Sequence, residues 1–257
     1  GMLYSGVGLG IFTSSIFIFL FTTENNWKIT WILLGVFALV MGSFVFFGMR
    51  QNSNVENETQ TLNEKEDKPK VKLNKKFIWG FSIAYFCEGA GYIITGTFLV
   101  AIVKSIPEFA DYAALSWMFV GLGAIPSTIL WSMMAEKLGY SKATNLAFIL
   151  QIIAVILPVF SESITSLVIS SILFGATFLG LTTLFMSKAQ TLMFQSNSKI
   201  NLVASLTVIY SLGQMIAPAL SGVLIGESGN YNAALIFASI ILCVGLLSSM
   251  YSYRVTN

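Results

Sequence analysis

Long apolar runs alternate with short polar segments along the chain. There are eight such runs, and they cover roughly residues 2–23, 28–49, 77–104, 112–135, 143–160, 164–187, 201–225 and 231–253. A helix needs roughly 20 mostly apolar residues to cross a bilayer. None of the runs alternates apolar and polar residues over about 10 positions, as the strands of a membrane barrel do. The pattern therefore predicts an all-α integral membrane protein with eight transmembrane helices.

One segment interrupts this pattern. Residues 50–76, RQNSNVENETQTLNEKEDKPKVKLNKK, are polar, mixed in charge and nearly free of large apolar side chains. Such a composition cannot bury a core, so the segment is predicted to be a flexible linker. A role of its lysine-rich end in contacting lipid headgroups stays open. The linker divides the chain into residues 1–49, with two helices, and residues 77–257, with six.

The composition agrees with a membrane environment. The 257 residues are 55% hydrophobic and 10% charged, with a mean hydropathy of +0.77, whereas soluble domains contain about 25% charged residues. The two cysteines, Cys87 and Cys243, both fall inside apolar runs, so a disulfide framework is not expected.

Lysine and arginine are unevenly divided between the two sides of the predicted membrane. With the first helix running outward, twelve of them fall on one side and only Lys28 and Lys104 on the other. Cytoplasmic loops carry the excess of Lys and Arg. This rule places the linker, the 136–142 loop, the 188–199 loop and the C-terminus in the cytoplasm.

A carboxyl group lies halfway along the third run, in the stretch YFCEGAGYIITGTF at 85–98. At 100° per residue, Tyr85, Glu88, Tyr92 and Thr95 share one side of a helix. An ionisable group at the bilayer centre costs at least about 2.5–3.5 kcal/mol and usually faces a cavity or a partner. No Lys or Arg lies deep in a run. The four residues are therefore candidates for a substrate or proton pathway; a neutral Glu88, hydrogen-bonded as structural glue, is the alternative.

A second polar stripe is predicted on the run 201–225. Tyr210, Gln214 and Pro218 recur every four residues and so share one helix face, which makes them a second candidate wall of the pathway. The small residues of the same run, Gly213, Ala217 and Ser221, form a different stripe that suits close helix packing. One stripe can pack while the other lines a cavity.

The first two helices look like a copy of the last two. Gly6 and Gly10 align with Ala217 and Ser221, and each pair is followed by a short external loop and a further apolar run. Parallel repeats about an axis along the membrane normal are one architecture of secondary transporters. With a repeat unit of six helices, the first half would lack its first four.

Two motifs resemble the major facilitator superfamily. The stretch SLGQMIAPALSG at 211–222 is similar to its pattern G-x-x-x-G-P-x-x-G-G. Small residues there, Gly222 included, imply close packing, and Pro218 implies bending. The stretch SMMAEKLGYSK at 132–142 is similar to the superfamily's G-x-x-x-D-R-x-G-x-R-R loop. The residues that match in type are Glu136, Lys137, Gly139 and Lys142. The resemblance implies a gating loop that helps to hold one closed state.

The stretch at 85–98, with YSGVGLGI at 4–11 upstream, resembles the YbfB/YjiJ-like branch of that superfamily. The resemblance extends over the whole chain and implies helices five to twelve of a twelve-helix fold. Residues 1–49 would be the last two helices of the N-terminal bundle, and residues 77–257 a complete C-terminal six-helix bundle. A missing N-terminal four-helix segment would be a partner. Members of this branch are transporters of the bacterial inner membrane.

Enzyme classes fit the sequence poorly. The chain has no histidine, which argues against Ser-His and His-metal sites. No run contains Asp, which argues against a paired-aspartate protease, and neither H-E-x-x-H, a phosphate loop nor a cysteine cluster occurs. Neither a metal nor a cofactor is therefore expected. The basic linker lacks interleaved aromatic residues, so nucleic acid is not an expected partner.

Together these features predict a secondary active transporter. Its fold would be a truncated major-facilitator fold, and its location the bacterial cytoplasmic membrane. It would move a small organic solute by alternating access, coupled to protons. A non-transporting remnant or membrane scaffold is the alternative from another class. A membrane enzyme of unrecognised type is a more distant one.

The charge distribution makes the topology testable. In a version of the protein without Cys87 and Cys243, a cysteine at Ser141 should be shielded from an impermeant thiol reagent added outside intact cells, because its loop is predicted to be cytoplasmic. A cysteine at Asn230 should react. The measurement is the mass shift of the purified protein after labelling, and the reverse pattern would invert the orientation.

Overall fold

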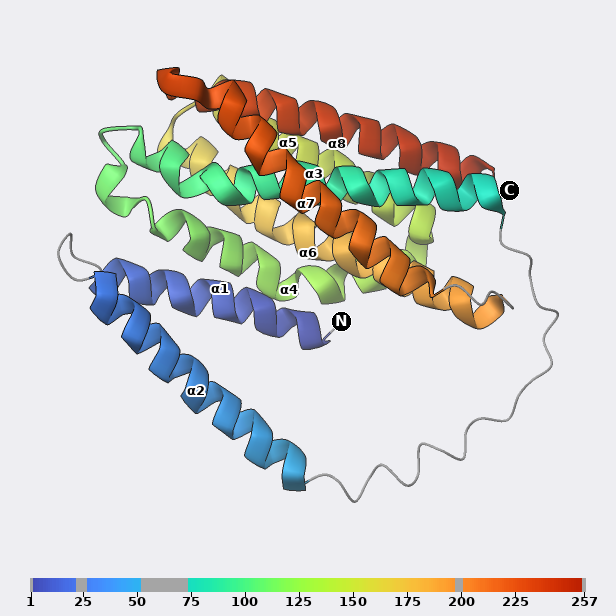
Figure 1. Cartoon of the computed structure of the whole chain (residues 1–257), viewed down its shortest axis with the longest axis horizontal. Helices are drawn as coiled ribbons and strands as arrows, with labels where there is room; N and C mark the ends of the chain where they lie inside the picture. The colour runs from blue at the N-terminus through green and yellow to red at the C-terminus, as the bar shows by residue number, and fades with distance from the viewer. Residues whose placement is uncertain (1, 22–26, 52–73, 197–200, 256–257) are drawn as a thin grey trace.

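The described part of the chain is built from α-helices (Figure 1). A computed structural model describes residues 2–21, 27–51, 74–196 and 201–255, and within these ranges no strand occurs. The helices are α1 (Met2–Phe21), α2 (Trp27–Gln51), α3 (Lys75–Lys104), α4 (Leu115–Leu138), α5 (Tyr140–Phe160), α6 (Ile164–Gln195), α7 (Leu202–Ile225) and α8 (Tyr231–Arg254), with short 3-10 turns η2 (Ala110–Tyr112) and η3 (Gly226–Ser228). The predicted all-α class is confirmed.

The lengths of the helices agree with a multi-pass membrane protein. Seven of them, α2 to α8, are long and apolar enough to cross a membrane, and the described apolar stretch of α1, Ser5–Phe21, is shorter. The count of eight spans therefore stays a prediction. Helix α6 also continues to Gln195, past the predicted end at 187. Its last turns stay helical because Ala189, Leu192 and Met193 still pack against the core.

Asparagine and glycine residues set several of the helix ends. The side chains of Asn74 and Asn201 accept hydrogen bonds from the first-turn amides of α3 and α7, at 3.0 and 3.1 Å. Gly139 separates α4 from α5 with a φ of 83°, in the left-handed region that favours glycine.

Helices α3 to α8 pack against one another (Figure 1). Helix α4 lies along α6, α3 contacts both α7 and α8, and α5 contacts α6 and α8. Helix α1 packs along α4, whereas α2 has its main described contact with α1. Only 6% of the apolar window of α2 is buried, so most of its surface is available to lipid. The predicted linker at 50–76 lies mostly outside the described residues, and the division into domains stays a prediction.

Two glycines bring α4 and α6 into backbone contact. A Cβ added to Gly123 would lie 2.1 Å from the carbonyl oxygen of Ile172, and one added to Gly175 would lie 1.9 Å from that of Val120. Neither position has room for a side chain. The two helices therefore pack through backbone atoms, as small residues allow in membranes.

A second reciprocal contact joins α1 to α4. A Cβ added to Gly8 would lie 2.6 Å from the backbone nitrogen of Ile125, and one added to Gly121 would lie 2.6 Å from that of Phe12. At the neighbouring Gly6 and Gly10, an added Cβ would meet no described atom within 4 Å. The close contact of α1 therefore runs through the middle glycine of the Gly-Val-Gly-Leu-Gly stretch.

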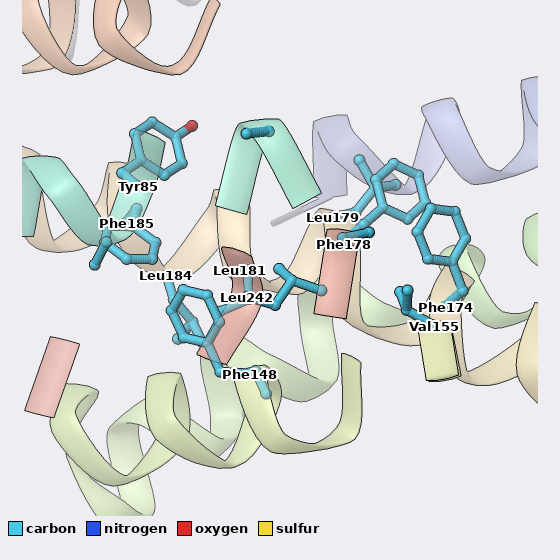
Figure 2. Packing of buried hydrophobic residues seen from close by; sticks show 14 of the residues in the cluster. Tyr85, Phe148, Val155, Phe174, Phe178, Leu179, Leu181, Leu184, Phe185 and Leu242 are labelled. Carbon is cyan, nitrogen blue, oxygen red and sulfur yellow. The ribbon is translucent and has the colours of Figure 1, made fainter. Parts of the chain in front are cut away.

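Aromatic rings form a continuous row between α3, α6 and α7, here called the aromatic row. Neighbouring ring centroids in the row lie between 4.5 and 5.8 Å apart. In order, the rings are Phe77, Phe81, Phe185, Tyr85, Tyr210, Tyr92, Phe178 and Phe174. Figure 2 shows Tyr85 beside Phe185 at one end of the core and Phe178 beside Phe174 at the other. Such ring pairs add about 0.5–1.5 kcal/mol each beyond the area that they bury.

The backbone contact between α4 and α6 predicts a strong effect of one methyl group. Gly175→Ala should lower the midpoint of thermal unfolding, because overpacking costs about 1–3 kcal/mol and the carbonyl it would strike belongs to a helix backbone. Gly10→Ala is the matched control and should leave the midpoint unchanged or slightly raised. Thermal unfolding in detergent, followed by circular dichroism, measures both variants. Equal midpoints would contradict the packing.

Candidate functional site

Glu88 lies near the middle of α3 and is removed from solvent. Its side chain is 0% exposed, and neither carboxyl oxygen forms a hydrogen bond of normal geometry within the described part of the protein. The Tyr210 hydroxyl is close enough to interact with the carboxyl, without meeting that geometry. A buried polar group without a full partner destabilises the fold. Within the described part, the near contact with the Tyr210 hydroxyl is therefore the interaction through which Glu88 would act as structural glue.

Glycines bring the neighbouring helices close to Glu88. A Cβ added to Gly89 would lie 2.7 Å from the carbonyl oxygen of Tyr210, and one added to Gly213 would lie 2.6 Å from that of Phe86. These two contacts press α7 against α3. On another side of α3, a Cβ added to Gly91 would lie 2.5 Å from Cγ of Leu242 in α8. The carboxyl is buried because α7 and α8 both approach α3 at this level.

Three tyrosines of the aromatic row surround this position. The ring centroids of Tyr85 and Tyr210 are 4.5 Å apart with an interplanar angle of 23°, and those of Tyr92 and Tyr210 are 5.8 Å apart at 14°. Tyr85 and Tyr92 come from α3, one turn before and one turn after Glu88, and Tyr210 comes from α7. The site thus combines one carboxyl with three electron-rich rings.

Polar side chains connect the tyrosines to α6 and α7. Gln214 Nε2 donates to the hydroxyl of Tyr92, and the Thr182 and Tyr210 hydroxyls are 3.5 Å apart. Tyr92, Thr182, Tyr210 and Gln214 are all half-buried. We call Tyr85, Glu88, Tyr92, Thr182, Tyr210 and Gln214 the Glu88 cluster. Four of its members carry half-buried hydroxyl or amide groups, whereas Tyr85 and Glu88 are buried.

Sequence reasoning missed Thr182. It lies in α6, and its hydroxyl also donates to the carbonyl of Phe178 at 3.1 Å. The signal for it was weak: two adjacent threonines, Thr182 and Thr183, in the middle of an apolar run. A threonine in a span commonly hydrogen-bonds to its own helix backbone, so the sequence alone does not separate it from Thr183.

The remaining predicted pathway residues, Thr95 and Pro218, lie one helical turn beyond Tyr92 and Gln214. Thr95 is buried two turns beyond Glu88, and its hydroxyl makes no hydrogen bond within the described residues. Pro218 is half-buried on α7, one turn beyond Gln214. No hydrogen bond within the described residues joins the Thr95 hydroxyl to the Glu88 cluster.

The small residues of α7 differ in burial. Gly213, Ala217 and Ser221 are buried along one stripe, whereas Gly222 is exposed and an added Cβ there would meet no described atom within 4 Å. The α7 helix continues through Pro218 to Ile225.

The predicted gating loop lies at the junction of α4 and α5. Glu136 and Lys137 belong to the last turn of α4, Gly139 makes the turn, and Lys142 lies in the first turn of α5. All four residues are exposed. The junction is thus a tight charged turn, and its role in gating stays a prediction.

Two comparisons with known proteins bear on this arrangement. A family model described as "Uncharacterised MFS-type transporter YbfB" matches residues 1–250. Among curated proteins, "Azole resistance protein 1" of Saccharomyces cerevisiae is 22% identical over 177 residues. The match covers 68% of this chain but 28% of the yeast protein, so the chain spans little more than a quarter of the length of that relative.

The geometry predicts that Glu88 is not needed for stability. Glu88→Met removes two oxygens that lack hydrogen bonds, so the midpoint of thermal unfolding should be equal to or above that of the wild type, by a gain of up to about 1–3 kcal/mol. Gln151→Met is the matched control, because Gln151 is also fully buried and its amide makes no hydrogen bond within the described part. A lower midpoint for Glu88→Met alone would identify the carboxyl as structural.

Proposed function

The chain belongs to the YbfB-type family of major facilitator superfamily transporters, and from this premise we propose that it is a secondary active transporter that moves a small organic solute in exchange or together with protons. This family is a class of membrane transporters and not of enzymes. The bilayer and a small-molecule substrate follow from the family. The coupling, the site and the mechanism are the proposal.

The burial of Glu88 carries the proposal. Its carboxyl is 0% exposed in the middle of a membrane-length helix, and the described residues give it no hydrogen bond of normal geometry. Ionisable groups at such depth are costly and mark substrate or ion pathways. A costly group whose oxygens lack a hydrogen bond of normal geometry points to a function, and uptake and release of a proton is the function that a carboxyl offers.

The half-buried members of the Glu88 cluster would form the solute-binding surface. Tyr92, Thr182, Tyr210 and Gln214 present hydroxyl and amide groups from α3, α6 and α7. Binding sites of transporters lie near the midplane of the bilayer. A solute that contacts these groups would lie beside Glu88, so that its binding and the protonation of the carboxyl influence one another.

Alternating access would come from rocking between two bodies. One body is α3–α8, which pack against one another, and the other contains α1 and α2. The contact between Gly8 and Gly121 brings the backbones of α1 and α4 together, so these two helices form the boundary across which such a motion would take place. The charged turn at 136–142 would help to hold one of the closed states.

We further propose a bacterial inner membrane as the location, with the linker and the C-terminus in the cytoplasm. In a twelve-helix protein, four more helices would complete the body to which α1 and α2 belong. A non-transporting scaffold of the same family is the competing function, and the experiment below separates the two.

Glu88→Gln tests the proposal in proteoliposomes that contain a fluorescent pH indicator. A panel of cationic, neutral and anionic organic solutes is added outside, and at least one should evoke a proton flux that requires the protein. Glu88→Gln keeps the size of the side chain but cannot titrate, so it should abolish this flux. Counterflow exchange of the same solute should survive, because exchange needs no net proton movement.

Glu108→Gln is the control for this experiment, because Glu108 is an exposed carboxylate in the connection between α3 and α4. It should behave as the wild type. Proton-coupled transport by Glu88→Gln at the wild-type rate would remove Glu88 from the mechanism. A wild-type protein that transports no solute of the panel would favour the scaffold.

A further inference from the structure

A small polar cavity lies between the start of α5 and the end of α8. Its volume is about 130 Å³, and it is lined by Ser141 and Asn145 of α5 and by Met250, Tyr253 and Arg254 of α8. Since one water molecule takes about 30 Å³ of the liquid, the cavity has room for about four water-sized groups. None of its lining residues belongs to the Glu88 cluster, so it is a separate site.

The start of α5 supplies hydrogen-bond donors beside this cavity. The residue before the helix is Gly139, and no side chain caps the first turn. The first amides of a helix have no acceptor within the helix, and they attract anions. Asn145 accepts a hydrogen bond from the hydroxyl of Ser249 through Oδ1, at 2.9 Å, so its Nδ2 remains to donate to a ligand. This side of the cavity therefore suits an anion.

The end of α8 adds a positive charge and a buried hydroxyl. Arg254 is exposed in the last turn of α8, and no ion pair joins it to a described carboxylate. The side chain of Tyr253 is only 9% exposed, and its hydroxyl makes no hydrogen bond of normal geometry within the described residues, although the Thr144 side chain is close enough to interact. A buried hydroxyl without a full partner is costly, and an acceptor in the cavity would provide one.

The whole of this end of the bundle is basic. Asn74 donates to the carbonyl of Val255 at 3.1 Å, so the start of α3 lies beside the end of α8 (Figure 1). Among the described residues, the basic side chains at this end are Lys75, Lys76, Lys137, Lys142, Lys188 and Arg254. The described carboxylate there is Glu136, and it does not line the cavity. The cationic part of a zwitterionic headgroup would therefore find no countercharge, whereas a net anion would.

The position of the cavity favours a lipid over an anion from solution. Helix α8 has 24 residues and is therefore about 36 Å long, which exceeds the hydrocarbon core of about 30 Å, so Arg254 at its end reaches the headgroups. On the same face of α8, Leu247 and Met250 are exposed, and on α5 the exposed Ile149 follows Asn145 by one turn. An acyl chain can lie along these apolar side chains while its phosphate occupies the cavity.

We propose that this cavity binds the phosphate of an anionic phospholipid such as phosphatidylglycerol. Arg254 supplies the countercharge, and Tyr253 and Asn145 donate hydrogen bonds to the phosphate oxygens. Basic pockets between membrane helices are suited to such headgroups. The site does not depend on the proposed transport function. Because the lipid binds the folded protein, it should also raise the midpoint of thermal unfolding.

Competition for a fluorescent lipid tests the proposal on the full chain in detergent. The probe is phosphatidylglycerol with a labelled acyl chain, and its fluorescence anisotropy reports binding. Unlabelled phosphatidylglycerol should displace it at a concentration about 5-fold or more below that of phosphatidylcholine with the same chains. Inorganic phosphate, compared with chloride at the same ionic strength, should not displace it, because it lacks the acyl chains.

Three substitutions locate the site. Arg254→Gln should weaken binding of the probe by about 5-fold or more, and Tyr253→Phe, which removes only the hydroxyl, by roughly 3-fold. Lys104→Gln is the matched control, because Lys104 is likewise an exposed basic residue in the last turn of a membrane-length helix, at the other end of the bundle. It should bind as the wild type does. Thermal unfolding without added lipid checks that each variant is folded.

Several outcomes would overturn the proposal. Equal displacement by phosphatidylcholine would show that the site does not select an anionic lipid, and displacement by inorganic phosphate would identify a ligand from solution. Equal weakening by Arg254→Gln and Lys104→Gln would reduce the effect to general attraction of charge. Unchanged binding by Tyr253→Phe would place the lipid outside the cavity. None of these measurements requires transport, so their failure leaves the proposed function untouched.

Discussion

Backbone contact between helices is the constraint on which the rest of this structure depends. Between helices in lipid, the burial of apolar side chains gains little, because the lipid tails are equally apolar. Close packing must therefore supply the attraction. Glycines allow it, because without a side chain the helix backbones can approach one another closely. Gly123 and Gly175 join α4 to α6, and Gly8 with Gly121 joins α1 to α4. Side chains at these positions would separate the helices.

The same constraint creates the unusual environment of Glu88. Gly89 and Gly213 press α7 against α3, so the carboxyl is enclosed by helix backbones and tyrosine rings and not by water. The enclosure raises the free energy of the charged group, because burial removes its hydration. The geometry thus opposes stability at this residue, and the proposed transport role would explain why the carboxyl is kept inside the membrane.

The helices differ in how much of their surface the chain itself covers. Helices α3 and α6 are about half covered by their neighbours, whereas α2 is almost entirely exposed within the described structure. Helix α1 packs along α4, with backbone contacts at Gly8 and Gly121 and a side-chain contact between the hydroxyls of Ser5 and Thr128. A membrane protein can bear such exposed apolar helices because lipid satisfies their side chains and the backbone is satisfied within each helix.

The sequence by itself determined the helical class and the approximate position of each helix. It also placed Tyr85, Glu88 and Tyr92 on one side of α3. Both results follow because hydrophobic runs and the 100° helical period are local properties of the chain. Tertiary structure alone decided which residues of other helices meet that side. It brought in Tyr210, Gln214 and the overlooked Thr182, left the Thr95 hydroxyl without a hydrogen bond within the described residues, and selected Gly8 over Gly6 and Gly10 as the contact of α1. These outcomes depend on the rotation and separation of packed helices, which are set by contacts between segments far apart in the chain.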